Sequence, residues 1–346
     1  MLNKNGYGGN AVKTIIKIEA IVLAVILFVG AVLCLLSAGA LMWLKEPVPV
    51  VHTAQPIPTD PAEPEAVKAE AVFTEETAAN LPHTREITAQ RYFVYDVRTG
   101  QYLQQKGELD EKLYPASITK LLSVYVMLQY MDPEETVTVG DALSLVQPDS
   151  SVAWLQAGDK LTVSQLVAAM MLPSGNDAAQ TAAVATGRVI ADNPNLAPAE
   201  ASQVFVKEMN AQAQALGMTG THFANADGFH DENHYTTMED LRILAEKVLA
   251  DPTIVSYTSR AEETVELLEG ERTWKNTNFL VQPQMETYIS STIGLKTGYT
   301  SAAGNCLMSA FFLKDRLLII GVFGTPAHTE DRFLDTVELF NTTVIS

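Results

Sequence analysis

Pro115-Ala116-Ser117-Ile118-Thr119-Lys120 is the most informative stretch of this 346-residue chain, because two later segments complete it. Alone, a serine three residues before a lysine occurs by chance in many helices. Ser174-Gly175-Asn176 begins 57 residues after Ser117, and Lys296-Thr297-Gly298 begins 122 residues after Ser174. The three segments in this order form a far more specific pattern than any one of them.

Pro115 predicts the start of a helix, with Ser117 in its first turn and Lys120 one turn further on the same face. Unpaired backbone N–H groups in a first turn favour a developing negative charge on the serine oxygen. The Lys120 amine can act as a base only if burial or a nearby cation lowers its pKa, and Lys296 would be that cation. A helix-start serine and a surface lysine are the structural alternative.

Ser174-Gly175-Asn176 follows Pro173, which predicts a tight loop after a helix. The Ser174 hydroxyl can relay a proton between the two lysines and a leaving amine, and the Asn176 amide can donate to a substrate carbonyl. Asp177 could simply cap the next helix. Taken alone, this tripeptide is more often structural than functional.

Lys296-Thr297-Gly298 lies at the end of an apolar strand, where a glycine allows close approach of a substrate backbone. Thr297 offers a hydroxyl to a terminal carboxylate, and Lys296 supplies positive charge. The backbone N–H groups of Tyr299 and Ser117 would form a two-donor oxyanion hole. A plain β-turn is the alternative for three residues alone.

The order of predicted elements indicates one α+β domain, with strands at both ends joined in one sheet and helices between. Strands are expected at 91–97, 102–105, 293–296, 305–313 and 317–323, and helices at 115–129, 162–171, 176–188, 199–216, 237–250 and 331–341. The apolar fraction of 47% is ordinary for a globular protein. The net charge of −18 argues against nucleic acid and against attachment to an anionic membrane surface.

The first 88 residues differ from the rest. Residues 20–44 carry no charge and are long enough to cross a bilayer, and three lysines in residues 1–19 favour a cytoplasmic N-terminus. A cleaved signal peptide is the alternative, since Ala38-Gly39-Ala40 has a small-x-small cleavage pattern. Residues 45–88 are rich in proline and acidic residues and predict an extended spacer. Either way residues 89–346 leave the cytoplasm.

Together the three segments resemble the D-alanyl-D-alanine carboxypeptidases, which are low-molecular-mass serine penicillin-binding proteins. The resemblance runs from Tyr92 to the C-terminus. It includes the segments 115–120, 174–179, Met209-Asn210, Leu216-Gly217-Met218, Asn225 with Asp227-Gly228, and 296–300. Many members carry a β-rich domain and a C-terminal anchor, whereas this chain stops at Ser346, so we expect its anchor at the N-terminus.

The resemblance implies a β-lactamase/penicillin-binding-protein-like fold, with an antiparallel sheet and a mostly helical subdomain, in a bacterial membrane protein. It implies that the terminal D-Ala of peptidoglycan stem peptides is removed through a serine acyl-enzyme, which penicillin also forms. Ser117 would be the nucleophile, Lys120 the base and Ser174 a proton relay. Substrate binding would fall to Asn176, Lys296, Thr297, Gly298, Tyr299 and Arg332, with no metal or other cofactor.

Three rivals remain open. Class A β-lactamases use a glutamate in an E-x-x-L-N segment, which is not found between Asn176 and Lys296. A zinc peptidase is suggested by His230 and His234, which are four residues apart, although the surrounding residues predict a loop. A membrane-tethered sensor that binds β-lactams or wall peptides without turnover is the third. Cys34 and Cys306 are too differently placed for a bridge to be expected.

Overall fold

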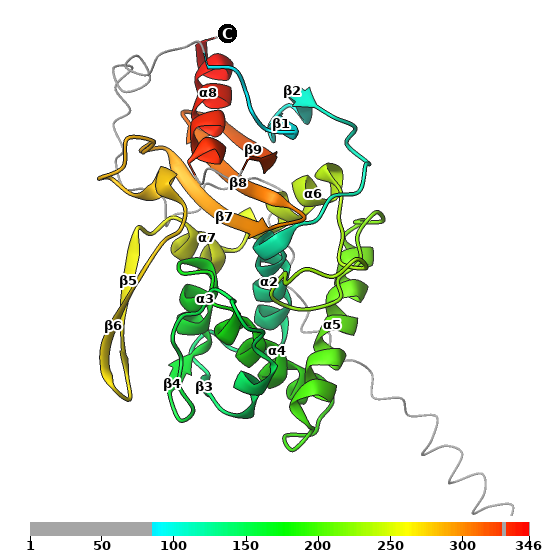
Figure 1. The fold of residues 1–346 in the computed structure, drawn as a ribbon, viewed down its shortest axis with the longest axis vertical. Coiled ribbons are helices and arrows are strands. Elements are labelled where there is room, and N and C mark those ends of the chain that lie inside the picture. Colours follow the sequence, from blue (N-terminus) through cyan, green and yellow to red (C-terminus); the bar gives the residue numbers. More distant parts are fainter. Residues whose placement is uncertain (1–84, 327–329, 346) are drawn as a thin grey trace, which may run out of the picture. The chain divides into compact units, whose positions relative to one another are not determined.

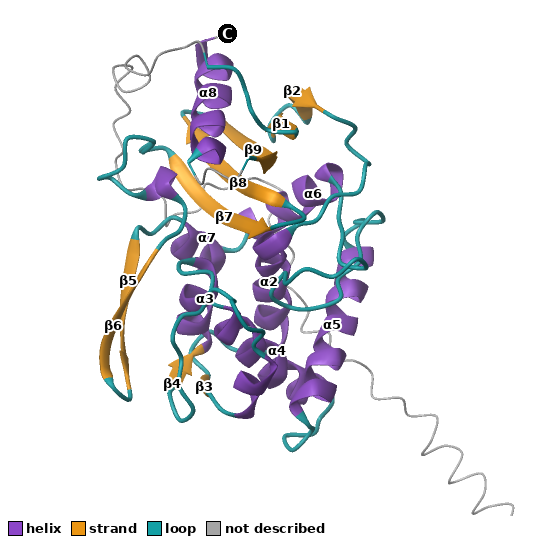
Figure 2. Ribbon diagram, viewed as in Figure 1, coloured by secondary structure: helices purple, strands orange, loops and turns teal. Residues whose placement is uncertain are grey.

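The computed structural model describes residues 85–326 and 330–345, and its centre is an antiparallel sheet of five strands in the order β2-β1-β9-β8-β7 (Figures 1 and 2). The bounds of these strands are Arg91–Asp96 (β1), Gln101–Lys106 (β2), Thr292–Thr300 (β7), Gly304–Leu313 (β8) and Arg316–Thr325 (β9). The first hairpin thus pairs with the last strands, because β1 lies antiparallel to β9. The prediction that one sheet joins both ends of the domain is confirmed.

The sheet is buried on both faces, which is why β8 and β9 read as continuous apolar runs rather than as alternating ones. Successive side chains point to opposite faces and enter different cores. One core holds Phe93, Met308 and Ile319, and the other holds Val94, Leu307 and Ile320. Helix α8 (Asp331–Ile345) covers the second core, and the remaining helices cover the first (Figure 2).

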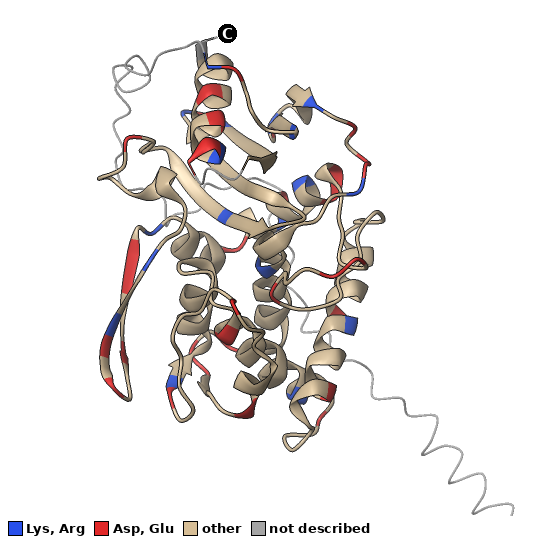
Figure 3. Ribbon diagram, viewed as in Figure 1, with Lys and Arg blue, Asp and Glu red and all other residues tan. Residues whose placement is uncertain are grey.

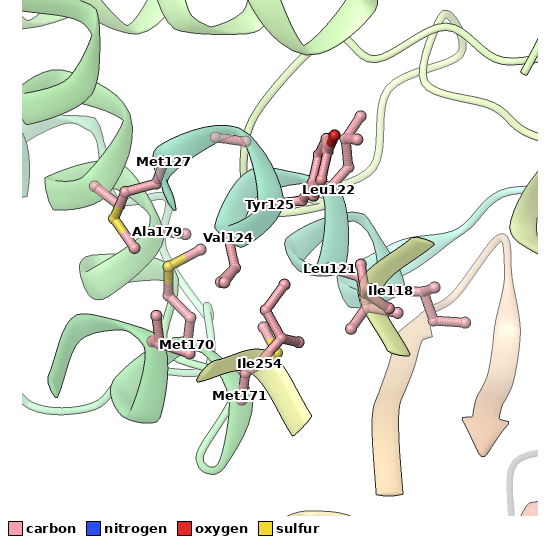
Figure 4. Packing of buried hydrophobic residues seen from close by; sticks show 14 of the residues in the cluster. Ile118, Leu121, Leu122, Val124, Tyr125, Met127, Met170, Met171, Ala179 and Ile254 are labelled. Carbon is pink, nitrogen blue, oxygen red and sulfur yellow. The ribbon is translucent and has the colours of Figure 1, made fainter. Parts of the chain in front are cut away.

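The helical part is arranged around α2 (Lys120–Tyr130), in which every residue from Lys120 to Met127 is buried. Other helices pack around α2 (Figure 4). Because this stretch of α2 has no side that faces solvent, its sequence is apolar nearly all round rather than amphipathic. The others are α3 (Val163–Met171), α4 (Asn176–Ile190), α5 (Pro198–Ala215), α6 (Met238–Leu249) and α7 (Pro252–Thr258). The helices expected at 162–171, 176–188, 199–216 and 237–250 are confirmed within two residues.

Two short ribbons, two short helical turns and helix α7 lay outside the sequence expectations. The ribbons pair β3 (Thr136–Thr138) with β4 (Lys160–Thr162) and β5 (Glu262–Leu267) with β6 (Gly270–Lys275). The turns are Asp141–Leu145 and Phe279–Val281. Charged residues lie along the β5–β6 hairpin, and only one of its faces is buried (Figure 3). Because charged residues are interspersed with the few buried ones, the sequence of this hairpin did not predict strands.

The expected helix from Pro115 begins differently. Ala116–Thr119 form a 3₁₀ turn, η2, and the α-helix begins only at Lys120. Ala116 has a φ of 49°, which is unusual for a residue other than glycine and prevents an α-helix from starting at Pro115. Ser117 therefore lies on a tight turn at the head of α2.

The expectations for residues 1–84, including the membrane-spanning segment 20–44, most of the spacer 45–88 and Cys34, fall outside the described residues. Within residues 85–326 and 330–345, no helix combines the length and the apolar character that a membrane crossing requires. Cys306 is a buried free thiol in β8.

Candidate active site

The turn that carries Ser117 is held by glycines from two other segments. A Cβ atom on Gly228 would lie 1.9 Å from the carbonyl oxygen of Ala116. A Cβ atom on Gly298 in β7 would lie 3.0 Å from the carbonyl oxygen of Pro115 and 3.1 Å from the Ala116 Cβ. Gly228 approaches the turn more closely than any side chain would allow, and a side chain at Gly298 would require its neighbours to shift by a few tenths of an ångström. The unusual backbone at Ala116 is thus fixed by tertiary packing.

Ser117 and Lys120 are in direct contact. The Lys120 Nζ lies 2.9 Å from the Ser117 Oγ, 2.7 Å from the Asn176 Oδ1 and 2.6 Å from the backbone oxygen of Asp227. Lys120 is completely buried, and this burial lowers its pKa to about 8, against the opposing charges of Asp227 and Asp177. A lysine in this state can exchange a proton with the serine at physiological pH.

Ser174 lies in the loop between α3 and α4, as expected, and Asn176 is the first residue of α4. Ser174 has a φ of 63° and is nearly buried. The Asn176 Oδ1 accepts from Lys120, and its Nδ2 donates to the Ser150 Oγ at 3.0 Å. Lys120 donates to Ser117, Asn176 and Asp227 but, in the described part of the chain, not to Ser174.

Asp177 does more than cap α4. Its carboxylate accepts the backbone N–H groups of Ala153 at 2.8 Å and Leu155 at 2.9 Å, as well as that of Ala178. The N-cap position itself belongs to Gly175. Asp177 therefore ties the head of α4 to the loop that presents Ser150 to Asn176.

Lys296 in β7 and Arg332 in α8 are the other two basic side chains of the site. Lys296 is buried, and its pKa is lowered well below the usual value by burial, then by Lys120 and Arg332. The Arg332 Nη1 donates to the carbonyl oxygen of Gly298 at 3.1 Å, and burial lowers its pKa to about 10. Neither cation forms an ion pair with a carboxylate of the described residues, and the Arg332 Nε is buried without a hydrogen bond. Such a region favours an anion.

These residues surround a cavity of about 610 Å³, a size typical of ligand sites. Lining it are seven of the predicted site residues: Ser117, Ser174, Asn176, Thr297, Gly298, Tyr299 and Arg332. Lys120 and Lys296 lie buried behind this wall. The Thr297 Oγ1 bonds to the Thr277 Oγ1 at 2.6 Å. The structure thus brings all nine predicted site residues together.

A second hollow of about 530 Å³ shares Ala302 with this cavity. Its walls come mainly from Arg91, Lys112, Glu232 and Tyr235. It contains neither the buried lysines nor a serine beside a base. The chemistry of the walls, not the volume, therefore identifies the candidate site.

The two histidines that suggested zinc have different surroundings. The His234 Nε2 lies 2.7 Å from the Thr119 Oγ1, and its Nδ1 accepts the Ala224 N–H at 3.1 Å. Burial lowers the pKa of His234 to about 3, so its ring is neutral. Thr119 in turn donates to the Ala116 carbonyl oxygen. His234 thus links the serine turn, through its Nε2, to the segment around Ala224, through its Nδ1. His230 instead lines the cavity with its ring against Tyr114.

Sequence reasoning did not identify the Asp227 backbone carbonyl or Ser150 as parts of the site. A main-chain oxygen has no residue-type signature, so only the fold could reveal it. Ser150 lies in a loop with no regular pattern. The Asp227-Gly228 pair was the one available signal, because a glycine there permits the close approach to Ala116.

Comparisons with known proteins agree with this arrangement. A family model described as D-alanyl-D-alanine carboxypeptidase matches residues 75–327. The carboxypeptidase DacF of Bacillus subtilis is 28% identical over 67% of this chain and 56% of the relative, and DacC of Escherichia coli is 30% identical over 74% and 60%. The D-alanyl-D-alanine carboxypeptidase of Streptomyces sp. K15 is 33% identical over 61% of this chain and 72% of the relative.

Solved structures are similar as well. The Streptomyces K15 DD-transpeptidase superposes with a TM-score of 0.68 at 29% identity, covering 76% of this chain and 99% of that structure. Penicillin-binding protein D2 from Listeria monocytogenes, in its cefotaxime-bound form, gives 0.62 at 27% identity, covering 76% and 100%. The chain spans less than two thirds of the length of several curated relatives, DacF and DacC among them.

Proposed function

This chain belongs to the D-alanyl-D-alanine carboxypeptidase family, and from that membership we propose that it removes the terminal D-Ala from peptidoglycan stem peptides through an acyl-enzyme on Ser117. The observation that carries the proposal is the 2.9 Å contact between the Ser117 Oγ and a buried Lys120 whose pKa lies near 8. A nucleophile beside a base of this kind is what serine acyl transfer requires.

Acylation follows from the positions of these groups. Neutral Lys120 takes the Ser117 proton while the oxygen attacks the carbonyl carbon of the penultimate D-Ala. The backbone N–H groups of Ser117 and Tyr299 stabilise the resulting oxyanion. The proton then passes from Lys120, with Ser174 as relay, to the amine of the departing D-Ala. For deacylation, neutral Lys120 takes a proton from the water that attacks the ester carbonyl, and it gives this proton to the Ser117 oxygen as the ester bond breaks.

Substrate selection follows from the cations and from the sheet. Neither Lys296 nor Arg332 has a carboxylate partner among the described residues, and the free carboxylate of a terminal D-Ala would supply one. Thr297 would donate a hydrogen bond to the same carboxylate. Strand β7 is at the edge of the five-stranded sheet, so an extended peptide can pair with it by strand addition. Penicillin, which carries a carboxylate beside its reactive amide, would acylate the same serine.

The same proposal assigns residues 20–44 as a membrane anchor, 45–88 as a spacer and 89–346 as a catalytic domain outside the cytoplasm. The charge-free run and the lysines that precede it support this arrangement. Fractionation of cells followed by mass determination of the protein distinguishes an anchor from a cleaved signal peptide. A mature chain that begins after Ala40 and separates from membranes would refute the anchor.

A fluorescent penicillin and a D-Ala release assay test the activity together. We expect labelling of the wild-type protein, release of D-Ala from a pentapeptide, and loss of both in Ser117→Ala with an unchanged melting temperature. β-Lactam hydrolysis without D-Ala release would indicate a lactamase, and release that chelators abolish would indicate a metal enzyme. Labelling without any release would indicate a sensor.

A further inference from the structure

We propose that Asp227 is a positioning residue of this site: its buried carboxylate fixes the carbonyl of the same residue against Ser117 and Lys120, and supplies the negative charge that balances the Lys120 ammonium. The inference rests on the proposed function, because it assigns Lys120 as the base of Ser117. It concerns a residue that touches the site through its backbone and acts on it through its side chain.

The backbone oxygen of Asp227 contacts both members of the reactive pair. It lies 2.6 Å from the Lys120 Nζ and 3.4 Å from the Ser117 Oγ. An acceptor at this place draws one ammonium proton away from the serine and so orients the lysine. A displacement of this carbonyl would change the line between Nζ and Oγ on which proton transfer depends.

The carboxylate of Asp227 keeps that carbonyl in place. Its Oδ2 accepts from the Gln180 Nε2 of α4 at 2.8 Å, and its Oδ1 accepts the Phe229 N–H at 2.8 Å. The side chain of Asn225 adds bonds to the Gly228 N–H and the Phe229 oxygen. The turn 225–229 is therefore closed on itself and fastened to α4 through Gln180.

The charge on Asp227 has a second consequence. The residue is 1% exposed, its side-chain donors are neutral, and it forms no ion pair with a lysine or arginine of the described residues. A buried carboxylate is costly unless an opposite charge compensates it. Lys120 is the cation that can compensate this charge, since it already contacts the backbone oxygen of Asp227.

The other charged groups around Lys120 are few. Asp177 at the head of α4 acts in the same direction as Asp227 but more weakly, and its carboxylate binds three backbone N–H groups. Lys296 in β7 is not among the groups that shift the Lys120 pKa, although Lys120 lowers the pKa of Lys296, and His234 is neutral. Asp227 is thus the largest single charge that opposes the effect of burial on the Lys120 pKa.

Asp227→Asn removes the negative charge of the side chain and keeps its size and shape. The Asn side chain can still accept the Phe229 N–H, and its amide can donate to the Gln180 Oε1 once the Gln180 amide turns over, since that oxygen has no hydrogen bond to lose. Removing the negative charge lowers the pKa of Lys120, so the base becomes neutral at lower pH. We expect the acidic limb of the acylation rate with fluorescent penicillin to move to lower pH, with full labelling retained.

Gln180→Met makes the complementary change, because it releases the turn from α4 and leaves the Asp227 charge. We expect acylation about 10- to 100-fold slower across the whole pH range, without a move of the acidic limb to lower pH. The two variants therefore separate the electrostatic and the positioning contributions of one residue.

Asp240→Asn is the matched control. Asp240 is also a buried carboxylate, and it accepts the Gly220 N–H at 2.8 Å and the Thr221 hydroxyl at 2.6 Å. It is not among the groups that shift the Lys120 pKa. We expect this variant to lose thermal stability and to keep the wild-type pH profile.

An unchanged pH profile in Asp227→Asn, or an equal shift in Asp240→Asn, would overturn the inference. A rate loss in Asp227→Asn that is uniform in pH and parallels its loss of melting temperature would show a structural role only and would overturn it too. Failure of the proposed function looks different: the wild-type protein would then not be labelled at Ser117 or would release no D-Ala.

Discussion

Lys120 and Lys296 are completely buried in a chain whose formal net charge is −18. Burial disfavours the charged form of both lysines and lowers their pKa values. Their surroundings assign them different tasks. Lys120 contacts the serine oxygen and faces two carboxylates, so it can gain and lose a proton. Lys296 has cations for neighbours and donates to the Thr297 backbone, so it serves an incoming anion.

The first prediction concerns pH. Acylation needs neutral Lys120, and the neutral fraction rises with pH through a pKa of about 8. The rate of labelling by fluorescent penicillin should therefore increase between pH 6 and 9 and then level off. Time courses at constant ionic strength measure this directly. A rate that is flat from pH 6 to 9 would mean that Lys120 is not the base.

The second prediction removes the base. Lys120→Met keeps most of the side-chain volume and loses the ammonium, so acylation should slow by about 10²- to 10⁴-fold and lose its acidic limb. Lys112→Met is the control, because Lys112 is exposed and lies over the Tyr235 ring. We expect wild-type labelling from that variant. Wild-type acylation in Lys120→Met would assign the base elsewhere.

Among the elements, the position of Ser117 depends on how closely three other parts of the chain approach the 3₁₀ turn Ala116–Thr119. Strand β7, the turn 225–229 and His234 meet it from different directions. A local pattern could predict that Ser117 begins a helix, because proline and the apolar spacing are local signals. It could not predict the left-handed conformation of Ala116, because that conformation is imposed by contacts with residues more than 100 positions away.

The third prediction tests this close approach. Gly228 and Gly217 have similar φ values of 82° and 87°, so alanine strains the backbone equally at both positions. That strain alone costs about 1–2 kcal/mol. At Gly217 nothing lies within 4 Å of the added Cβ, whereas at Gly228 it would meet the Ala116 oxygen at 1.9 Å.

Gly228→Ala should therefore lose about 3 kcal/mol or more of unfolding free energy and acylate far more slowly, whereas Gly217→Ala should show the smaller loss and normal acylation. Denaturant unfolding and penicillin labelling of the two variants supply the measurements. Equal effects at the two positions would show that backbone strain, rather than contact with the serine turn, controls the site.

At the scale of the whole molecule, the sequence predicted the parts of the fold that follow from periodicity and from the order of elements. The sheet that joins both ends, the four middle helices and the convergence of nine site residues agree with expectation. The β5–β6 hairpin and the β3–β4 ribbon were missed because short, half-exposed strands resemble loops in composition. The hydrogen bonds of Asp177 to Ala153 and Leu155 and that of Asp227 to Gln180 could not be predicted, since they join helix α4 to loops that are distant in the chain.

The last prediction concerns where the folded unit starts. Asp335 in α8 is buried, and its carboxylate accepts from the Arg85 side chain at 3.2 Å and from the backbone N–H groups of Thr88 at 3.0 Å and Ala89 at 2.8 Å. These bonds tie the entry of the domain to its final helix, across the outer face of the sheet. They favour Arg85, rather than residue 89, as the start of a stable fragment.

A fragment of residues 85–346 should accordingly melt at the same temperature as the catalytic part of the full chain and label equally fast with fluorescent penicillin. A fragment of residues 91–346 leaves the Asp335 carboxylate buried without these donors, which costs about 3–5 kcal/mol. For a unit of this size, that loss corresponds to a melting temperature lower by roughly 10 °C. Equal melting temperatures for the two fragments would show that the bonds of Arg85, Thr88 and Ala89 to Asp335 contribute nothing to stability, because the two proteins differ only in residues 85–90.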